Sequence, residues 1–176
     1  EKKIYIMAHF NHPRELTPEA IEGLNMLMKS GVTLVNQTPL VKGVNDDAEV
    51  LAELFSKLSY IGVPPYYVFL CRPTLGNETY SVPVEEGYEI FEKSRTLCSG
   101  LAKRARLVMS HESGKIEVLG MTEDQIFFKY LRAADKNNNA RFLSFFRNPE
   151  ACWFDDYQEV SDEFSLFSQT AKTRCV

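Results

Sequence analysis

With 176 residues, of which 44% are hydrophobic and 25% charged, the chain can bury one sizeable core and has the composition of a globular protein. Its formal net charge of −4, with basic and acidic residues interspersed, excludes the basic surface typical of a nucleic-acid-binding protein. No apolar run approaches the ~20 residues of a membrane-spanning helix, and the first residues lead into a short strand rather than a signal peptide. We therefore expect a cytoplasmic protein with neither nucleic-acid nor membrane partners.

The N-terminal part of the chain alternates between apolar runs of strand length and runs with helical spacing. Thr17 and Pro18 have the residue types of an N-cap and a first helical position, and Asp46 and Asp47 those of an N-cap and a first-turn acid. Strands that alternate with helices at short spacing run parallel through right-handed crossovers, so we predict the α/β class. Strands are predicted at residues 4–10, 32–35 and 65–71, and helices at residues 17–31, 50–58 and 83–99.

After the third predicted helix the pattern changes to short β-like runs separated by polar turns. We expect strands or hairpins appended to the α/β part, and we divide the chain into residues 1–120 and a β-rich extension at 121–176. From Ser161 the sequence is polar with isolated Phe and Leu, which is consistent with either a docking helix or a loose tail. The β-like runs cover residues 106–109, 115–119, 125–131 and 141–146.

The cysteines lie far apart in the sequence and form no CxxC or CxxxC pair. We expect free thiols, no disulfide framework, and no metal site assembled from this chain alone. The four residues are Cys71, Cys98, Cys152 and Cys175.

Polar side chains follow the predicted strands. His9 ends the first strand, Gln37 follows the second, and Arg72 follows the third. Because functional groups collect at the carboxyl ends of parallel strands, these residues are candidates for a common site. Taken alone, His9 and Gln37 are more typical of strand-end side chains that are satisfied locally, and Lys115 is more typical of a solvated turn lysine.

Three motifs resemble those of the lysine 2,3-aminomutase family of radical S-adenosylmethionine (SAM) enzymes. They are HFNHP at residues 9–13, NQTPLVKGVND at residues 36–46 and PYY at residues 65–67, in the family's order and at similar separations. The resemblance covers about residues 6 to 119. Val82-Pro83-Val84 with Gly87, Ser99-Gly100 and Gly114-Lys115-Ile116 fit the same family.

The resemblance implies a radical enzyme in which a four-iron four-sulfur (4Fe-4S) cluster cleaves SAM. Pyridoxal phosphate (PLP) holds the substrate amine in this family while the amine migrates between neighbouring carbons, so the cofactors supply the chemistry and the protein orients them. By position, His9 and Gln37 match family residues that contact SAM. Lys115 matches the lysine that binds PLP covalently, and it is the catalytic residue expected in this chain.

The family's CxxxCxxC cluster motif is absent from this chain. Since such a cluster needs three thiolate ligands held together, the ligands are expected outside these residues, and the chain alone is expected to be inactive. The resemblance therefore implies the C-terminal half of a radical-SAM TIM-like barrel, whose partner is the missing N-terminal half. The sequence leaves open whether the protein forms a homo-oligomer.

The expected substrate-binding residues are Arg72 and Ser110. Lysine-using members of the family have acids at the positions that Arg72 and Ser110 take here. A guanidinium would repel a lysine side chain and can pair bidentately with a carboxylate. We therefore expect an amino acid with an acidic or neutral side chain, such as glutamate, rather than lysine.

Two alternatives remain open. The family's Gly-rich approach to the PLP lysine is reduced here to Ser113-Gly114, and Phe69 stands at a family tyrosine. A radical SAM enzyme that has lost PLP is therefore one alternative. The other, of a different class, is a non-catalytic α/β assembly domain.

Overall fold

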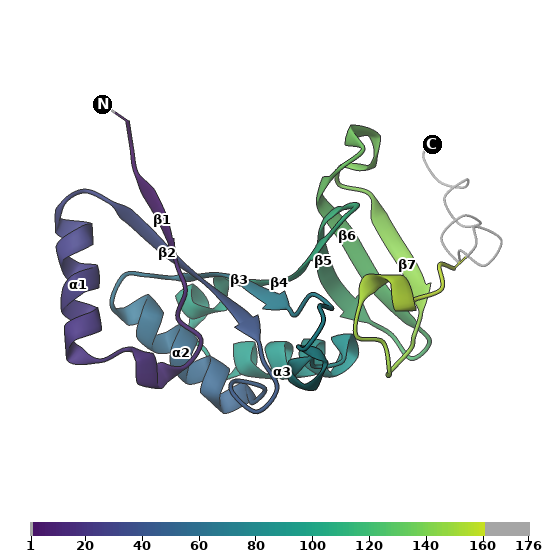
Figure 1. The fold of residues 1–176 in the computed structure, drawn as a ribbon, viewed down its shortest axis with the longest axis horizontal. Helices are drawn as coiled ribbons and strands as arrows, with labels where there is room; N and C mark the ends of the chain where they lie inside the picture. Colours follow the sequence, from purple (N-terminus) through teal and green to yellow (C-terminus); the bar gives the residue numbers. More distant parts are fainter. Residues whose placement is uncertain (1, 161–176) are drawn as a thin grey trace, which may run out of the picture.

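A computed structural model describes residues 2–160 of the chain. Its seven strands form a single sheet in sequence order, in which β1 to β4 are parallel neighbours and β4 to β7 are antiparallel neighbours (Figure 1). The strands are β1 (Tyr5–Ala8), β2 (Thr33–Leu40), β3 (Pro65–Leu70), β4 (Arg106–His111), β5 (Gly114–Met121), β6 (Gln125–Ala133) and β7 (Phe142–Phe146). The helices α1 (Pro18–Lys29), α2 (Ala48–Tyr60) and α3 (Val84–Thr96) connect the parallel strands. The predicted α/β class, with β-strands appended at its end, is confirmed.

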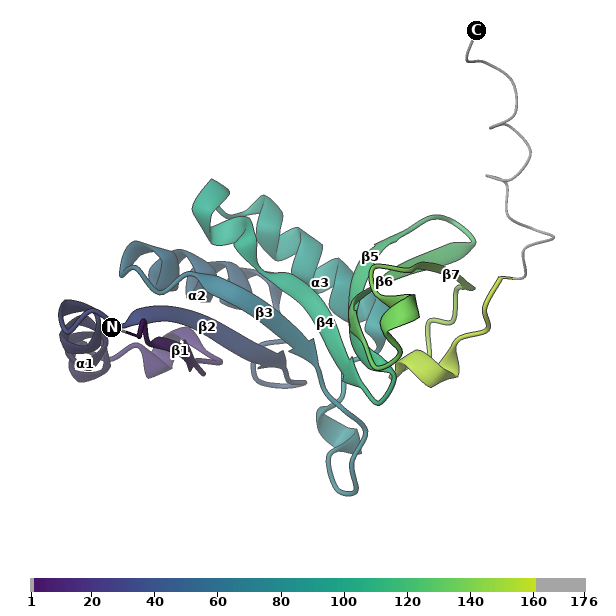
Figure 2. The same ribbon diagram turned by 90° about the horizontal axis from the view of Figure 1, so that it is seen from above.

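The helices lie on one face of the sheet (Figure 2). Leu24 of α1 and Leu54 of α2 form an apolar cluster with Leu34 of β2. Phe55 of α2 and Phe91 of α3 belong to a larger cluster that continues beneath β4 to β7. Within residues 2–160, the opposite face of the parallel strands carries no helix, so its side chains are available for a site.

The helix starts follow the predicted capping chemistry with one exchange. Thr17 Oγ1 accepts a hydrogen bond from Ala20 N at 3.2 Å, which confirms it as the N-cap of α1. Asp47, rather than Asp46, is the N-cap of α2, and its carboxylate accepts from Val50 N at 3.0 Å. The neighbouring Asp46 instead accepts from Gly43 N at 2.8 Å, and so closes the turn before the helix.

The second strand is longer than predicted. β2 continues to Leu40, so Gln37 lies within the strand rather than after its end. Pro39 is tolerated there because β1 pairs with β2 only as far as Asn36, which leaves β3 as the single neighbour of the last residues. The first strand is shorter than predicted and ends at Ala8.

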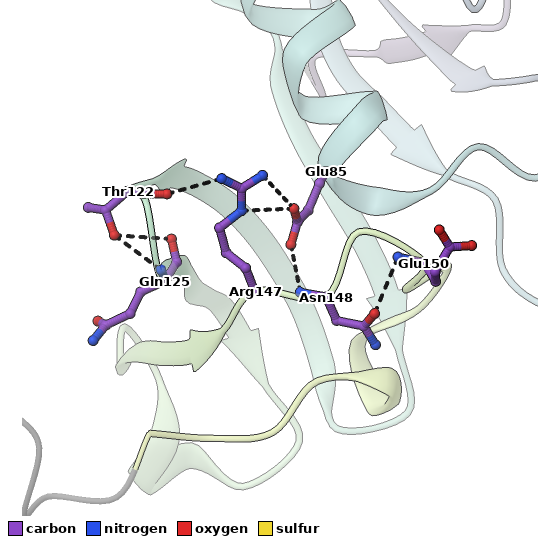
Figure 3. A network of polar contacts seen from close by, with 6 residues as sticks. All are labelled: Glu85, Thr122, Gln125, Arg147, Asn148 and Glu150. Carbon is purple, nitrogen blue, oxygen red and sulfur yellow. Dashed lines mark hydrogen bonds and ion pairs between the residues drawn. The ribbon is translucent and has the colours of Figure 1, made fainter.

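The residues after β7 return to the helix-covered face of the sheet. This C-terminal segment, residues 147–157, places Trp153 and Tyr157 in the main core beside Phe128 of β6. At its start, the buried carboxylate of Glu85 in the first turn of α3 accepts from Arg147 Nε at 2.9 Å and from Asn148 N at 2.8 Å (Figure 3). The segment is therefore attached to α3 by a buried ion pair as well as by apolar packing.

Several sequence expectations concern ends and boundaries. No helix among residues 2–160 is long and apolar enough to cross a membrane. Cys71, Cys98 and Cys152 are free thiols, as predicted, whereas Cys175 and the tail from Ser161 lie outside the described residues. The proposed boundary between residues 120 and 121 falls at the end of β5. Because β5 and β6 pair within the same sheet, the sheet does not separate the two parts there, and the boundary stays a prediction.

Replacing Glu85 by Gln should lower the free energy of unfolding by about 1–3 kcal/mol. The Arg147 guanidinium would lose its charged acceptor at a site where Glu85 is only 3% exposed. Urea unfolding measures the change, and Glu86→Gln is the matched control because Glu86 lies in the same helical turn but is exposed. Equal losses in the two variants would contradict a specific role for the buried ion pair.

Candidate active site

Lys115 lies near the start of β5, on the sheet face opposite the helices. Its Nζ atom is 4.1 Å from the centroid of the Tyr67 ring and 5.1 Å from that of Phe69, both on β3. Burial against these rings lowers the pKa of the Lys115 ammonium, and burial raises the pKa of Tyr67 to about 12. Lys115 is therefore a partly desolvated amine against two aromatic side chains rather than a solvated turn lysine.

The residue before Lys115 must be glycine for a steric reason. Gly114 has φ +142°, and a Cβ at this position would lie 2.2 Å from the carbonyl oxygen of Arg132 on β6. The absence of a side chain lets β5 and β6 approach closely at the point where Lys115 leaves the turn. Gly114 thus determines the path of the chain into Lys115.

The two residues expected to contact SAM lie along the same face, toward β1. Gln37 is the register partner of Tyr67, which in turn contacts Lys115. His9 is exposed and directly follows Ala8, the last residue of β1 that pairs with β2. Across the sheet from β1 to β5, the predicted cofactor residues therefore follow in the order His9, Gln37 and Lys115.

Arg72 and Ser110, the expected substrate residues, line a common hollow. This hollow has a volume of about 320 Å³ and lies at the carboxyl ends of β2, β3 and β4. Ser110 is also the register partner of Lys115, and Phe69 both lines the hollow and contacts Lys115. The structure thus brings Arg72, Ser110 and Lys115 to one region, although they are distant in the sequence.

Sequence analysis missed the structural role of the buried polar residues in the motifs. Asn45 is fully buried, donates from Nδ2 to the carbonyl oxygens of Asn11 and Pro39 at 2.9 Å each, and accepts from Val41 N at 2.7 Å. Asn36 accepts from Phe10 N at 2.8 Å and donates to Phe10 O at 3.0 Å. These side chains hold the loop after β1 against the end of β2. The signal was present, because Asn36 has the same strand parity as the buried Leu34 and Leu40.

A second missed group surrounds the turn between β4 and β5. His111 Nε2 lies 3.0 Å from a carboxylate oxygen of Asp155, and its Nδ1 lies 2.6 Å from Ser113 Oγ. Ser113 Oγ is also 2.9 Å from the Tyr130 hydroxyl. This group joins the Lys115 hairpin to the C-terminal segment. No local motif could have predicted it, because Asp155 is 44 residues from His111.

The described residues contain no metal site. Among residues 2–160, no three His, Cys, Asp or Glu side chains come together in an arrangement that could hold an ion. The location of the cluster ligands outside this chain stays a prediction.

Comparisons with known proteins identify the relatives of the chain. No family model matches it. A protein of Aquifex aeolicus (strain VF5) named "Putative L-lysine 2,3-aminomutase" is 59% identical over 163 residues, which are 93% of this chain and 44% of that protein. The L-lysine 2,3-aminomutase of Clostridium subterminale is 43% identical over 97 residues, or 55% of this chain and 23% of that enzyme. The glutamate 2,3-aminomutase of Clostridioides difficile (strain 630) is 38% identical over 111 residues, or 63% of this chain and 26% of that enzyme.

These relatives are amino-acid aminomutases, so the chain is homologous to a class of isomerases. Within that class, it is homologous to lysine 2,3-aminomutase-like proteins, as its motifs predicted. The chain spans less than half the length of each of these relatives.

Replacing Asn45 by Ala should destabilise the fold by about 2–3 kcal/mol, because three buried backbone groups would lose their hydrogen-bond partner. Chemical denaturation measures the loss. Asn25→Ala, on the exposed surface of α1, is the control and should be neutral or slightly stabilising. A neutral Asn45→Ala variant would show that the motif asparagine has another role.

Proposed function

We propose that this chain forms part of a radical SAM, PLP-dependent amino-acid 2,3-aminomutase. The observation that carries the proposal is the position of Lys115: a partly desolvated amine against Tyr67 and Phe69, in the sheet region that also holds Arg72 and Ser110. Homology to proteins named as aminomutases supports the reaction class. The chain alone is expected to be inactive, because the cluster ligands would come from the rest of the protein.

The residues around Lys115 fit PLP. A lysine binds this cofactor through its neutral amine, and the lowered pKa of Lys115 increases the neutral fraction at a given pH. The flat faces of Tyr67 and Phe69 offer an apolar surface for an aromatic ring and keep water from the amine. When bound, PLP would carry the substrate amine, while SAM and the 4Fe-4S cluster would supply the radical.

The remaining residues of the site would orient the other reactants. Gln37 and His9 follow Lys115 across the sheet toward β1, which is where we place SAM. Arg72 and Ser110 would hold the substrate side chain in the hollow. Within residues 2–160, the Arg72 guanidinium makes no ion pair, so it can bind a carboxylate without displacing a protein partner.

We also propose that residues 1–120 are one part of a TIM-like barrel and that residues 121–176 form its β-rich extension. Parallel strands with helices on one face and polar side chains on the other are the wall of such a barrel. The exposed β1 edge would pair with a strand from the rest of the protein. A homo-oligomer is compatible with this arrangement.

The substrate we propose is an amino acid with an acidic side chain, glutamate being the obvious candidate. A relative whose name specifies glutamate is 38% identical to this chain, while two relatives named for lysine are 59% and 43% identical. The chemistry of Arg72 supports the acidic substrate, because a guanidinium repels the lysine ammonium and pairs with a carboxylate.

PLP should bind covalently to Lys115 in the full-length protein, and the attachment should rise with pH as the amine loses its proton. Because burial lowers the pKa of Lys115, attachment should reach half its maximum at a lower pH than for the same lysine in the urea-unfolded protein. Borohydride reduction followed by peptide mass spectrometry measures the modified fraction, with Lys115→Arg as the control. Equal modification of Lys115→Arg would exclude this lysine, and no modification of either protein would favour the enzyme that has lost PLP.

A full-length protein without a CxxxCxxC motif would favour the non-catalytic domain.

Replacing Arg72 by Asp in the full-length enzyme should raise the KM for glutamate about 10–100-fold, because a charge-assisted hydrogen bond is lost and a like charge is introduced. Steady-state kinetics with glutamate and lysine measure the change in preference. Arg104→Asp is the matched control, since Arg104 is exposed at the amino end of β4. Unchanged glutamate kinetics in Arg72→Asp would refute the proposed pairing.

A further inference from the structure

The hollow that holds Arg72 and Ser110 has one wall outside the motifs at residues 9–13, 36–46 and 65–67. Trp153 lines it, together with Phe69 and Pro39 from β3 and β2. Trp153 is only 8% exposed and is the single tryptophan of these 176 residues. The indole thus forms one side of an open hollow whose other lining groups include the two residues proposed to bind the substrate side chain.

The wall is held by contacts on both sides of Trp153. One carboxylate oxygen of Asp156 accepts the backbone N–H groups of Cys152 and Trp153, each at 2.9 Å. Asp155 binds His111 at 3.0 Å, which joins the same stretch to the Lys115 hairpin.

Apolar and ionic packing hold the rest of the C-terminal segment. The Phe154 ring packs edge-to-face against Phe128, with centroids 5.4 Å apart, and Glu85 binds the start of the segment through Arg147 and Asn148 (Figure 3). Trp153 is therefore a fixed surface and not part of a loose lid.

The chemistry of the hollow selects a short acidic group. Arg72 supplies a cation, Ser110 supplies a hydroxyl, and Phe69 and Trp153 supply apolar faces for methylene groups. A volume of about 320 Å³ accommodates a small side chain, and the indole is one fixed side of this otherwise open hollow.

We propose that Trp153 is a specificity-determining residue, whose indole forms the fixed wall of the hollow and sets the length of acidic side chain that Arg72 and Ser110 can hold. This inference rests on the proposed aminomutase function. It predicts that glutamate fits the hollow and that its longer homologue 2-aminoadipate is excluded by the indole.

Kinetics of the full-length enzyme test the length limit. Trp153→Ala should raise the ratio of kcat/KM for 2-aminoadipate to that for glutamate about tenfold or more, the effect of accommodating one further methylene. Phe142→Ala is the control, because Phe142 is an exposed aromatic residue of β7 and should leave the ratio unchanged. An unchanged ratio in a folded, active Trp153→Ala enzyme would overturn the proposal.

A binding measurement separates this inference from the proposed function and does not depend on turnover. Subtracting the fluorescence of Trp153→Phe from that of the wild-type full-length protein isolates the Trp153 emission, which is then titrated with glutarate. A saturable change that Arg72→Ala abolishes is the expected result. Glutarate could change this emission while the holoenzyme reconstituted with its cofactors rearranges no amino acid. That result would refute the aminomutase function and still support an acid-binding hollow beside Trp153. If the emission does not respond to glutarate, Trp153 is not a wall of the binding site, whatever the enzyme rearranges.

Discussion

The alternation of side chains along β2 and β3 determines which residues of these strands join the core and which face the candidate site. In each strand, one set of residues is buried beneath the helices, and the other set faces the opposite side. A shift of one residue would exchange the two sets, so the burial of Leu34, Leu40 and Val68 also holds Gln37, Tyr67 and Phe69 on the open face. The candidate site therefore depends on the same register as the core.

Buried polar side chains maintain that register where the strands end. Asn36 and Asn45 satisfy backbone groups in the loop after β1, and Glu85 does the same for the start of the C-terminal segment. Each would be costly without its partners, because an unpaired polar group in the interior loses its hydrogen bonds to water. The motif asparagines thus contribute to the candidate site indirectly, because they hold the strand ends beside which the exposed His9 and the half-buried Gln37 lie.

The C-terminal segment links the antiparallel part of the sheet to the site in the parallel part. It returns across the helix-covered face, packs on Phe128 and brings Trp153 to the hollow at the carboxyl ends of β3 and β4. The match to the Aquifex aeolicus protein spans 93% of the chain and so extends into this segment, whereas the matches to the two named clostridial enzymes span 55% and 63%. The part of the molecule proposed to set substrate length lies outside the three motifs at residues 9–13, 36–46 and 65–67.

The sequence by itself determined the α/β order, the positions of the helices and the candidates Lys115, Gln37, His9, Arg72 and Ser110. Local physics was sufficient for the fold: helical spacing, capping residues and alternating apolar residues act over a few positions. The extension of β2 to Leu40 was not predicted, and Pro39 is unfavourable in a strand with two neighbours. Pro39 fits because β1 stops pairing at Asn36, which leaves the end of β2 with one neighbouring strand. The tertiary structure alone decided that Lys115 is desolvated by Tyr67 and Phe69, that Arg72 and Ser110 share a hollow with Trp153, and that His111 meets Asp155. These contacts join residues tens of positions apart, and they form only when the whole sheet, its helices and the returning segment are packed together.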